Sequence, residues 1–515
     1  MKPLTRRKFI SRTASAGGVL LIPPYLSGCL SSQNNMGKSG YFETEFGIHE
    51  KLCRKLLETA LSKGGNFADL YFEHTISGVL VLEDGKVNQS YGNINLGVGI
   101  RTVKDDQVGY GFTQVLTEES MLSAARTAAS LVNASAVPPE DQFITPEIGD
   151  YYPVSTYFNE FPVSSKLPIM QDINEKCFAL SELVRKVTVV FQDEMKRIMV
   201  VTSDGVKAED LIPGNFCYTS VIAEKEGKME SGGWEFGGHR DFSWYDPDLV
   251  EKLSHESVQR TLIKFDAIQP PAGEMPVVLG SGITGVLLHE AIGHGMEADF
   301  NRKNISVYST MIGKKVAEPF VTIIDDGTIP NLSGSINVDD EGTPGKKTIL
   351  VEDGILTGYL HDKISARYYN VEPTGNGRRQ SYEYMPFPRM RNTFMMPGEA
   401  TPDDVIKQVK NGIYVQDVSN GEVFIGQGDF SFYVSQGYRI ENGKFTAPIK
   451  DINIMGNGPK MLENITMAAN DLSMYQGGAG FCGKENQGVK VSFGLPTCLV
   501  KSMTVGGTGQ KGGVS

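Results

Sequence analysis

The segment from Gly282 to Asp299 carries the residues of this chain that are best suited to metal chemistry. It places His289, Glu290 and His294 in an apolar helical pattern that opens with a glycine-rich turn. Zinc in proteins prefers imidazole and thiolate ligands, and a hydrolytic zinc site keeps one position open for water. In the common zinc helix, two histidines stand four residues apart and a glutamate follows the first of them.

The spacing in this chain is His-Glu-x-x-x-His, so the two histidines stand five residues apart. On a regular α-helix such positions differ by about 140° and cannot share one metal ion. A π-helical turn is wider and reduces the difference to roughly 50°, and Gly293 and Gly295 would tolerate the distortion. We therefore predict a widened turn, with Glu290 as the general base that takes a proton from zinc-bound water. The alternative is a plain polar stripe on a helix.

Two histidines leave a catalytic zinc ion one protein ligand short. The candidates for the third ligand are Glu297, a remote carboxylate or a thiolate. Cys482 has glycines around it that would allow close approach to a metal ion, and nearby Lys484 would favour its thiolate form. A small buried cysteine in a tight loop is the alternative. The five other histidines form no rival cluster along the chain: His49, His74, His239, His255 and His361.

The N-terminal segment has the pattern of an export signal. Arg6 and Arg7 stand in Thr-Arg-Arg-Lys-Phe-Ile, ahead of a weakly apolar stretch that is too short to span a membrane. Leu26-Ser-Gly-Cys29 then matches the cleavage box of bacterial lipoproteins. We expect twin-arginine export and lipidation of Cys29, which would leave the protein attached to a membrane of the cell envelope by its lipid anchor only.

Charge and cysteine content narrow the function classes further. The formal net charge is -12, and without the five basic residues of positions 1–28 it becomes -12 - 5 = -17. A chain this acidic lacks the electrostatic field that attracts nucleic acid, so we expect no nucleic-acid partner. Five cysteines remain after Cys29, and their scattered positions do not predict a disulfide framework.

Helical periodicity and turn signals predict an α+β protein, because helices and antiparallel hairpins are mixed without a βαβ rhythm. A helix followed by hairpins occurs twice in the first half, which suggests a duplicated topology without a residue-level repeat. Two N-terminal domains of helices and hairpins should precede a larger, mostly antiparallel, β-rich domain that carries the metal helix. The expected division is 1–28 signal, 29–45 polar tether, 46–135 N-terminal domain, 154–266 central domain and 274–515 C-terminal metallopeptidase domain.

Several segments have specific start and turn signals. Asp84-Gly85 predicts a hairpin turn, and Thr117 and Asp246 predict helix N-caps. Helices are expected over about 47–61, 117–132, 167–184 and 246–265. Strands are expected over 95–103, 108–115, 187–191 and 197–202.

Five stretches resemble the TldD/PmbA family of zinc metallopeptidases, in its catalytic TldD-type branch. They occur in one order, and the resemblance covers most of residues 46–515: 289–297 (HEAIGHGME), 339–345 (DDEGTPG), 375–379 (GNGRR), 388–393 (PRMRNT) and 481–484 (FCGK). The resemblance implies that His289, His294 and Cys482 bind Zn²⁺ and that Glu290 is the catalytic base. It also implies unfolded or extended peptides as substrates and a dimer, formed with a second copy or with a PmbA-like subunit. Members of the family are usually cytosolic, so the export signal is a departure.

Four further residues are candidates for substrate binding. His361 could polarise the scissile carbonyl group. Arg378, Arg389 and Arg391 could hold a peptide backbone or a terminal carboxylate, and structural ion pairs are the alternative. Two other functions stay open: a non-catalytic peptide-binding or maturation subunit with a structural metal, and a zinc amidase that acts on cell-wall peptides.

Overall fold

The computed structural model describes residues 40–131, 135, 137–157, 161–478 and 480–507. The chain divides into two compact units, Met1–His49 and Glu50–Ser515. In the first unit the described part is a short helix, α3 (Tyr41–Phe46), which ends at Gly47 in the left-handed conformation. The expected export signal and Cys29 lie outside the described residues. None of the described helices is both long and apolar enough to cross a bilayer.

The second unit begins with two successive sets of a helix, three strands and a helix, and this recurrence agrees with the predicted duplicated topology. The first set is α4 (Glu50–Ala60), β1 (Phe67–Glu83), β2 (Lys86–Lys104), β3 (Gln107–Thr113) and α5 (Glu118–Ser130). The second is α6 (Val163–Leu180), β4 (Val184–Thr202), β5 (Lys207–Lys225), β6 (Lys228–Gly238), η3 (Phe242–Trp244), α7 (Pro247–Leu262) and η4 (Ile263–Phe265).

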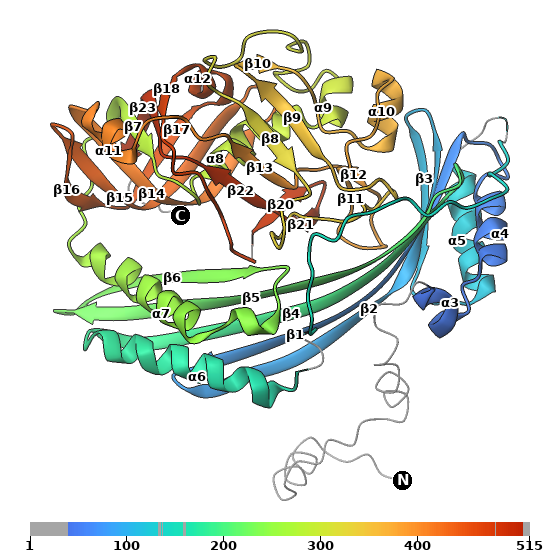
Figure 1. Cartoon of the computed structure of the whole chain (residues 1–515), viewed down its shortest axis with the longest axis horizontal. Coiled ribbons are helices and arrows are strands. Elements are labelled where there is room, and N and C mark those ends of the chain that lie inside the picture. The colour runs from blue at the N-terminus through green and yellow to red at the C-terminus, as the bar shows by residue number, and fades with distance from the viewer. Residues whose placement is uncertain (1–39, 132–134, 136, 158–160, 479, 508–515) are drawn as a thin grey trace, which may run out of the picture. The chain divides into compact units, whose positions relative to one another are not determined.

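All six strands belong to one antiparallel sheet with the order β3-β2-β1-β4-β5-β6, drawn in blue and green in Figure 1. β1 pairs with β4 over 15 residues, from Asp69 opposite Thr202 to Glu83 opposite Thr188. The expected N-terminal and central ranges therefore share a sheet. Alternation of side chains gives the sheet two apolar faces. On one face Val187 and Val189 pack with α6 and α7, and on the other Ile198 and Val200 pack with C-terminal residues.

The local signals placed most of these elements correctly. Asp84 and Gly85 both have positive φ, as a two-residue hairpin turn requires, and β1 and β2 pair on either side of it. The side chain of Thr117 accepts the Ser120 N–H bond, and that of Asp246 accepts the Leu249 N–H bond.

Two predictions about the central range need correction. The strands expected at 187–191 and 197–202 are parts of one strand, β4, because the residues between them also pair with β1 and β5. The helix expected at 167–184 is α6, which starts and ends four residues earlier, and Leu183 and Val184 already belong to the sheet edge.

The C-terminal part is β-rich, which confirms the expected α+β class. Its helical elements are α8 (Gly285–Leu288), η5 (His289–Gly293), η6 (His294–Met296), α9 (Ala298–Arg302), α10 (Lys363–Tyr369), α11 (Pro402–Lys407) and α12 (Gly458–Glu463). Its strands are β7 (Gly273–Leu279), β8 (Ile323–Asp326), β9 (Lys347–Glu352), β10 (Ile355–Leu356), β11 (Gly377–Arg378), β12 (Phe387–Pro388), β13 (Asn392–Met395), β14 (Asn411–Phe424), β15 (Asp429–Glu441), β16 (Lys444–Ile449), β17 (Ile452–Asn457), β18 (Ile465–Ala468), β19 (Ser473–Met474), β20 (Phe481–Lys484), β21 (Gln487–Lys490), β22 (Ser492–Leu495) and β23 (Cys498–Gly507).

These strands form two larger sheets and two small ribbons. One sheet has the order β10-β9-β8-β13-β22-β19. In the other, β14-β7-β23-β17-β15 closes into a ring because β14 also pairs with β15. The helical segment α8–η5 packs between the two sheets, against β13 and β22 on one side and β14 and β15 on the other. Its residues Leu287, Leu288 and Ile292 belong to the largest apolar core, so the segment is held from both sides.

A buried ion network joins the first sheet to the C-terminal part. The guanidinium of Arg101 on β2 pairs with Asp69 on β1 at 2.5 Å and with Glu341 at 2.6 Å. Arg379 adds a 3.2 Å pair to the other oxygen of Asp69. All four side chains are excluded from solvent, so their mutual pairing is what offsets the cost of burying charge.

We predict that Arg101→Met lowers the free energy of unfolding by roughly 3 to 5 kcal/mol, because it leaves Asp69 and Glu341 buried without their cation. Urea unfolding followed by circular dichroism measures the change. The control is Arg185→Met, because the Arg185–Glu224 pair is nearly half exposed on both sides and should change stability by less than about 1 kcal/mol. Equal effects of the two substitutions would contradict a network that holds the two parts together.

Candidate metal centre

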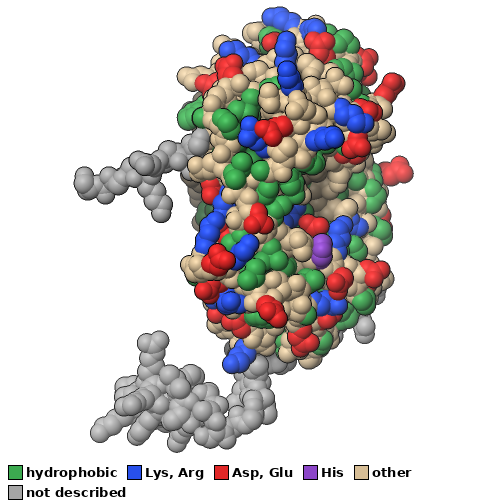
Figure 2. Space-filling model, turned by 90° about the vertical axis from the view of Figure 1, so that its left-hand side faces the viewer, with side chains coloured by type: hydrophobic (Ala, Val, Ile, Leu, Met, Phe, Trp, Pro, Cys, Tyr) green, Lys and Arg blue, Asp and Glu red, His purple; other side chains and the backbone are tan. Residues whose placement is uncertain are grey.

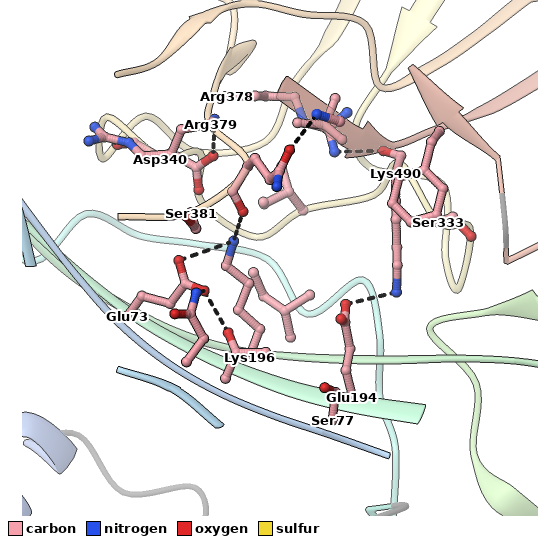
Figure 3. Close-up of a pocket in the computed structure, with 18 of the residues that line it drawn as sticks. Glu73, Ser77, Glu194, Lys196, Ser333, Asp340, Arg378, Arg379, Ser381 and Lys490 are labelled. Carbon is pink, nitrogen blue, oxygen red and sulfur yellow. Dashed lines mark hydrogen bonds and ion pairs between the residues drawn. The ribbon is translucent and has the colours of Figure 1, made fainter. Parts of the chain in front are cut away.

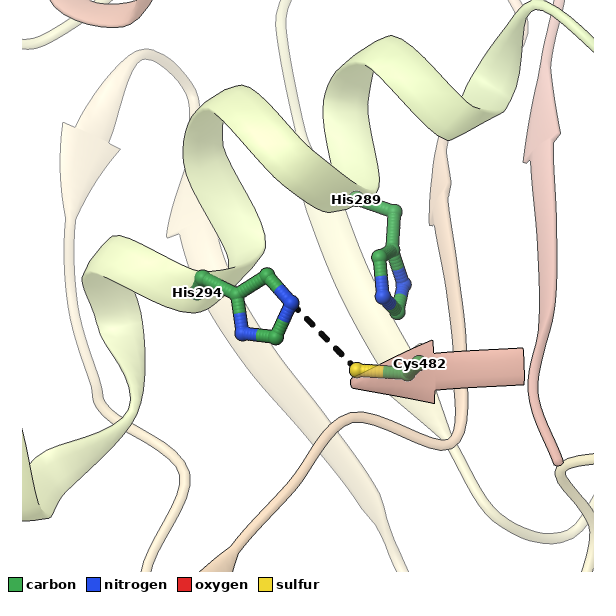
Figure 4. Close-up of side chains that lie close together, drawn as sticks. All are labelled: His289, His294 and Cys482. Atoms are coloured by element: carbon green, nitrogen blue, oxygen red, sulfur yellow. Dashed lines mark hydrogen bonds between the residues drawn. The ribbon is translucent and has the colours of Figure 1, made fainter. Parts of the chain in front are cut away.

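The two histidines of the predicted zinc helix lie on a π-helical turn. α8 is regular α-helix up to Leu288, η5 is a π-helix from His289 to Gly293, and η6 is a 3₁₀ turn from His294. The widened turn that their spacing required is therefore present. Figure 4 shows both imidazoles on the same side of this segment, with ring centroids 5.2 Å apart.

The turn also needs glycine at its end for packing. A Cβ atom on Gly293 would lie 1.9 Å from the Sδ atom of Met390, far inside contact distance. Met390 is fully buried between two sequence neighbours that are themselves buried, so it has little room to move. Gly293 therefore brings the helix against this chain segment, in addition to tolerating the π geometry.

The third member of the cluster arrives on a strand. β20 pairs with β21 in a two-stranded ribbon, and side chains alternate between its faces. Phe481 is exposed, whereas Cys482 and Lys484 point inward. As Figure 4 shows, the Cys482 sulfur points toward the histidines, and it lies 3.3 Å from His294 Nε2.

The ligand atoms of His289, His294 and Cys482 all lie within 4.8 Å of one another, and all three side chains are buried. Bond lengths of about 2.0–2.3 Å in a tetrahedral zinc site imply ligand separations of roughly 3.3–3.8 Å, so a small adjustment would suffice. Both ring nitrogens of His289 are buried without a hydrogen-bond partner among the described residues. An unpaired buried imidazole is costly, and a bound metal ion would satisfy it. The donor set thus fits zinc.

Electrostatics at the cluster favour the ligand form of the thiol. Burial alone raises the pKa of Cys482, but the neighbouring imidazoles of His294 and His289 outweigh it and hold the pKa well below its usual value. The pKa of His294 is lowered by burial and raised more strongly by the negative charges of Cys482 and Glu297, with a net increase. A thiolate beside imidazoles is the ionisation state in which cysteine binds metal.

Glu297, one of the three candidates for the third ligand, has a different role. Its carboxylate lies 3.1 Å from His294 Nδ1, the ring nitrogen that faces away from Cys482. Lys484 Nζ donates to Glu297 at 2.9 Å and to Asp299 at 2.7 Å. Burial raises the pKa of Glu297, but Lys484 and His294 lower it to about 2, so the group is ionised. A carboxylate behind a metal-binding histidine fixes its ring orientation and tautomer.

The expectation that Lys484 itself favours the thiolate of Cys482 is not what the geometry supports. The ammonium group is committed to Glu297, Asp299 and the Pro388 carbonyl, and the pKa of Cys482 responds mainly to the two histidines. The alternation within β20 could have indicated that Cys482 and Lys484 share a face. Their partners come from a segment 185 residues or more away and could not be inferred locally.

Glu290 lies on the π turn between the two histidines. Its Oε2 atom is 3.5 Å from His294 Nε2, the nitrogen that faces the cluster, and its side chain is 22% exposed. It therefore lies at the metal position while still reaching solvent. This is the placement that a general base requires, because it must contact water at the metal and release the proton later.

The other four predicted site residues lie outside the cluster. Arg389 is fully buried and donates to the Cys482 carbonyl, so we assign it to positioning the β20 strand rather than to substrate. Arg378 donates to the carbonyls of Met390 and Lys490, and Arg391 to that of Gly375. His361 is buried beside Tyr359 and Tyr369, and burial lowers its pKa to about 4, which makes it a neutral imidazole near pH 7.

Two cavities lie between the first sheet and the C-terminal part. One, of about 550 Å³, borders the outer side of the β20–β21 ribbon, and Arg378 and Arg391 are among the residues that line it (Figure 3). The other, of about 430 Å³, lies between β5, β6 and the segment around Asp417. Figure 2 shows that the molecule is hollowed between these two parts.

Comparison with known proteins gives three family models that match in sequence order. They are the PmbA/TldA metallopeptidase domain 1 at residues 68–132, its central domain at 156–265 and its C-terminal domain at 272–507. The chain is 38% identical to a metalloprotease TldD homolog of Haemophilus influenzae, over 86% of this chain and 93% of that protein. It is 28% identical to a zinc metalloprotease TldD homolog of Saccharolobus solfataricus, over 88% and 99%.

Solved structures share the fold. A crystal structure from Thermotoga maritima matches with a TM-score of 0.71 and 24% identity, covering 88% of this chain and 99% of that one. The structure of TldE from Thermococcus kodakarensis matches with a TM-score of 0.68 and 17% identity, covering 88% and 100%.

We predict that Gly293→Ala weakens zinc binding by roughly tenfold or more, because the added methyl group must displace Met390 and the turn with it. Metal analysis after dialysis against a zinc-buffered solution measures the loss. The matched control is Gly483→Ala, next to Cys482, where an added Cβ meets no atom within 4 Å. Full zinc content in Gly293→Ala would show that the packing of the turn does not determine the site.

Proposed function

Because this chain belongs to the PmbA/TldA metallopeptidase family, we propose that it is a zinc-dependent peptidase that hydrolyses bonds in unfolded or extended peptides. The observation that carries the proposal is the convergence of His289, His294 and Cys482 on one point, with Glu290 beside it. Three protein ligands leave one position of a tetrahedral zinc ion for water or substrate, which is the arrangement of catalytic rather than structural sites.

His289, His294 and Cys482 would hold the ion in this site. When bound there, zinc supplies Lewis acidity that activates water and polarises the substrate carbonyl. Glu290 accepts a proton from the attacking water at its carboxylate and then passes it to the leaving amine. Glu297 keeps His294 in the required orientation, and Lys484 and Asp299 hold Glu297 in turn.

The backbone of β20 offers a place for an extended peptide. β20 pairs with β21 on one side, and no described strand pairs with its other side. Gly480 accepts a hydrogen bond from Val491, so by alternation the backbone groups of Phe481 and Gly483 point outward from the ribbon. A peptide strand added there would run beside Cys482, and backbone hydrogen bonds would give affinity with little sequence preference.

We further propose that the protein acts as a dimer, either of two copies or with a PmbA-like subunit. The support is the long outer edge of β2. β3 pairs with β2 only from Val98 onward, so the edge from Lys86 to Gly97 has no strand partner within the described part of the chain. Tyr91 and Ile94 on this segment are about half exposed. Unpaired edges of this length usually pair with another chain or are otherwise protected.

The location of the protein follows from its first 29 residues. We propose export by the twin-arginine pathway and attachment to a membrane of the cell envelope through lipid on Cys29, on the sequence signals of Arg6-Arg7 and Leu26–Cys29. Such export carries folded proteins, so the metal ion can be loaded before transport.

We predict that Glu290→Gln lowers peptidase activity on casein by roughly 100- to 10,000-fold and keeps about one zinc ion per chain, since only the proton acceptor is lost. Cys482→Ser should lose both activity and most of the zinc, because it removes a ligand. Activity assays and metal analysis of the purified soluble domain separate the two effects. Unchanged activity in Glu290→Gln would exclude it as the base, and zinc-free wild-type protein would contradict the proposal as a whole.

We predict that Cys29→Ser moves the protein from the membrane fraction to the soluble fraction of a bacterial host with twin-arginine export, because the acyl anchor is lost. Fractionation and immunoblotting measure the distribution. Ser32→Ala, three residues further along the tether, serves as the control and should stay with the membrane. A membrane-bound Cys29→Ser protein would contradict lipid attachment at this residue.

A further inference from the structure

The larger cavity is lined by charged side chains on two facing walls (Figure 3). One wall is the first sheet, which contributes Glu73, Glu194 and Lys196. The other is the C-terminal part, which contributes Arg378, Arg379, Arg391, Lys490 and Asp340. A cavity of about 550 Å³ with this lining suits a polar, charged ligand rather than an apolar one.

Most of these charges are already paired. Lys490 Nζ lies 2.8 Å from Glu194, and Lys196 Nζ lies 3.7 Å from Glu73 (Figure 3). The side chain of Arg379 pairs with Asp69, and its backbone N–H donates to Asp340. These contacts leave two cations of the lining to account for.

Arg378 and Arg391 are those two cations, and neither has a carboxylate within 4.0 Å among the described residues. Arg378 bonds only to the carbonyls of Met390 and Lys490. Arg391 Nε donates to the Gly375 carbonyl, and its Nη2 atom has no hydrogen-bond partner. Both side chains are more than nine-tenths buried. Burial and the like charge of Arg391 hold the pKa of Arg378 well below its usual value, which is the signature of a cation without a counter-ion.

The cavity is physically connected to the metal centre. Phe481, Val489 and Lys490 of the β20–β21 ribbon line it, while Cys482, next to Phe481, points to the histidines on the other side. Arg378 Nη2 donates to the Lys490 carbonyl at 2.6 Å, so the cationic wall is bonded directly to the ribbon. A peptide that passes along the free edge of β20 would thus bring a nearby end of its chain to the cavity.

We propose that this cavity is a subsite for a carboxylate group, which Arg378 and Arg391 bind, and that the group is the C-terminal carboxylate of the bound peptide. Guanidinium groups bind carboxylates by charge-assisted and often bidentate hydrogen bonds, and a carboxylate here would satisfy Arg391 Nη2 and neutralise the cationic pair. The inference rests on the proposed function for the identity of the ligand as a peptide. An acidic side chain carries the same chemistry, and the experiment distinguishes the two sources.

The test measures the affinity of three short, unstructured, N-terminally labelled peptides that contain no other acidic residue. One has a free C-terminal carboxylate, one has a C-terminal amide, and one has the amide after a final Glu. Fluorescence anisotropy with the zinc-containing Glu290→Gln protein, at fixed ionic strength, gives Kd without cleavage. We expect the amide to bind about tenfold or more weakly than the free acid, which corresponds to about 1.4 kcal/mol. Recovery of affinity by the final Glu would assign the subsite to acidic side chains as well as termini.

Equal Kd values for the free acid and both amides would overturn the proposal, and this comparison needs no substitution in the cavity. In Arg378→Gln the preference for the free acid should shrink to less than about threefold, whereas Lys264→Gln, which removes a cation from the smaller cavity, should keep it. A wild-type protein that binds the free acid preferentially but cleaves nothing would refute the peptidase proposal alone. A protein that cleaves all three peptides without preference in binding would refute the subsite alone.

Discussion

The π turn at His289–Gly293 is the constraint on which the metal centre depends. Regular helix would point the two imidazoles about 140° apart, and one extra residue in the turn brings them to the same side. Such a turn is not favoured by itself, so the surrounding structure must hold it. Two sheets pack on α8 and η5 from opposite sides, and Gly293 fits against Met390 with no space for a methyl group.

The second requirement is that a distant strand place its thiol at the same point. Cys482 lies 188 residues after His294, on a two-stranded ribbon with few backbone contacts to either large sheet. Buried charges supply the missing restraint. Arg389 bonds to the Cys482 carbonyl, and Lys484 from the same strand joins Glu297, which in turn orients His294. The carboxylate behind His294 and the sulfur in front of it thus belong to one network.

The sequence allowed the helix turn and the local signals to be predicted because each depends on residues close together in the chain. The spacing of His289 and His294 required the π turn, and Asp84, Thr117 and Asp246 marked a hairpin and two helix starts that the structure contains. Features that depend on long-range contacts were missed or misplaced. Examples are the pairing of β1 with β4, the role of Glu297 and the burial of Arg389, because no local pattern specifies which distant group will be opposite. The convergence of Cys482 was expected from family resemblance rather than from spacing.

The central claim, that His289, His294 and Cys482 hold one zinc ion on the π turn, is tested most directly by X-ray absorption at the zinc edge of the purified protein. The account predicts one sulfur ligand at about 2.3 Å and nitrogen or oxygen ligands at about 2.0–2.1 Å, in fourfold coordination. A spectrum without a sulfur contribution, or with only oxygen ligands, would contradict it.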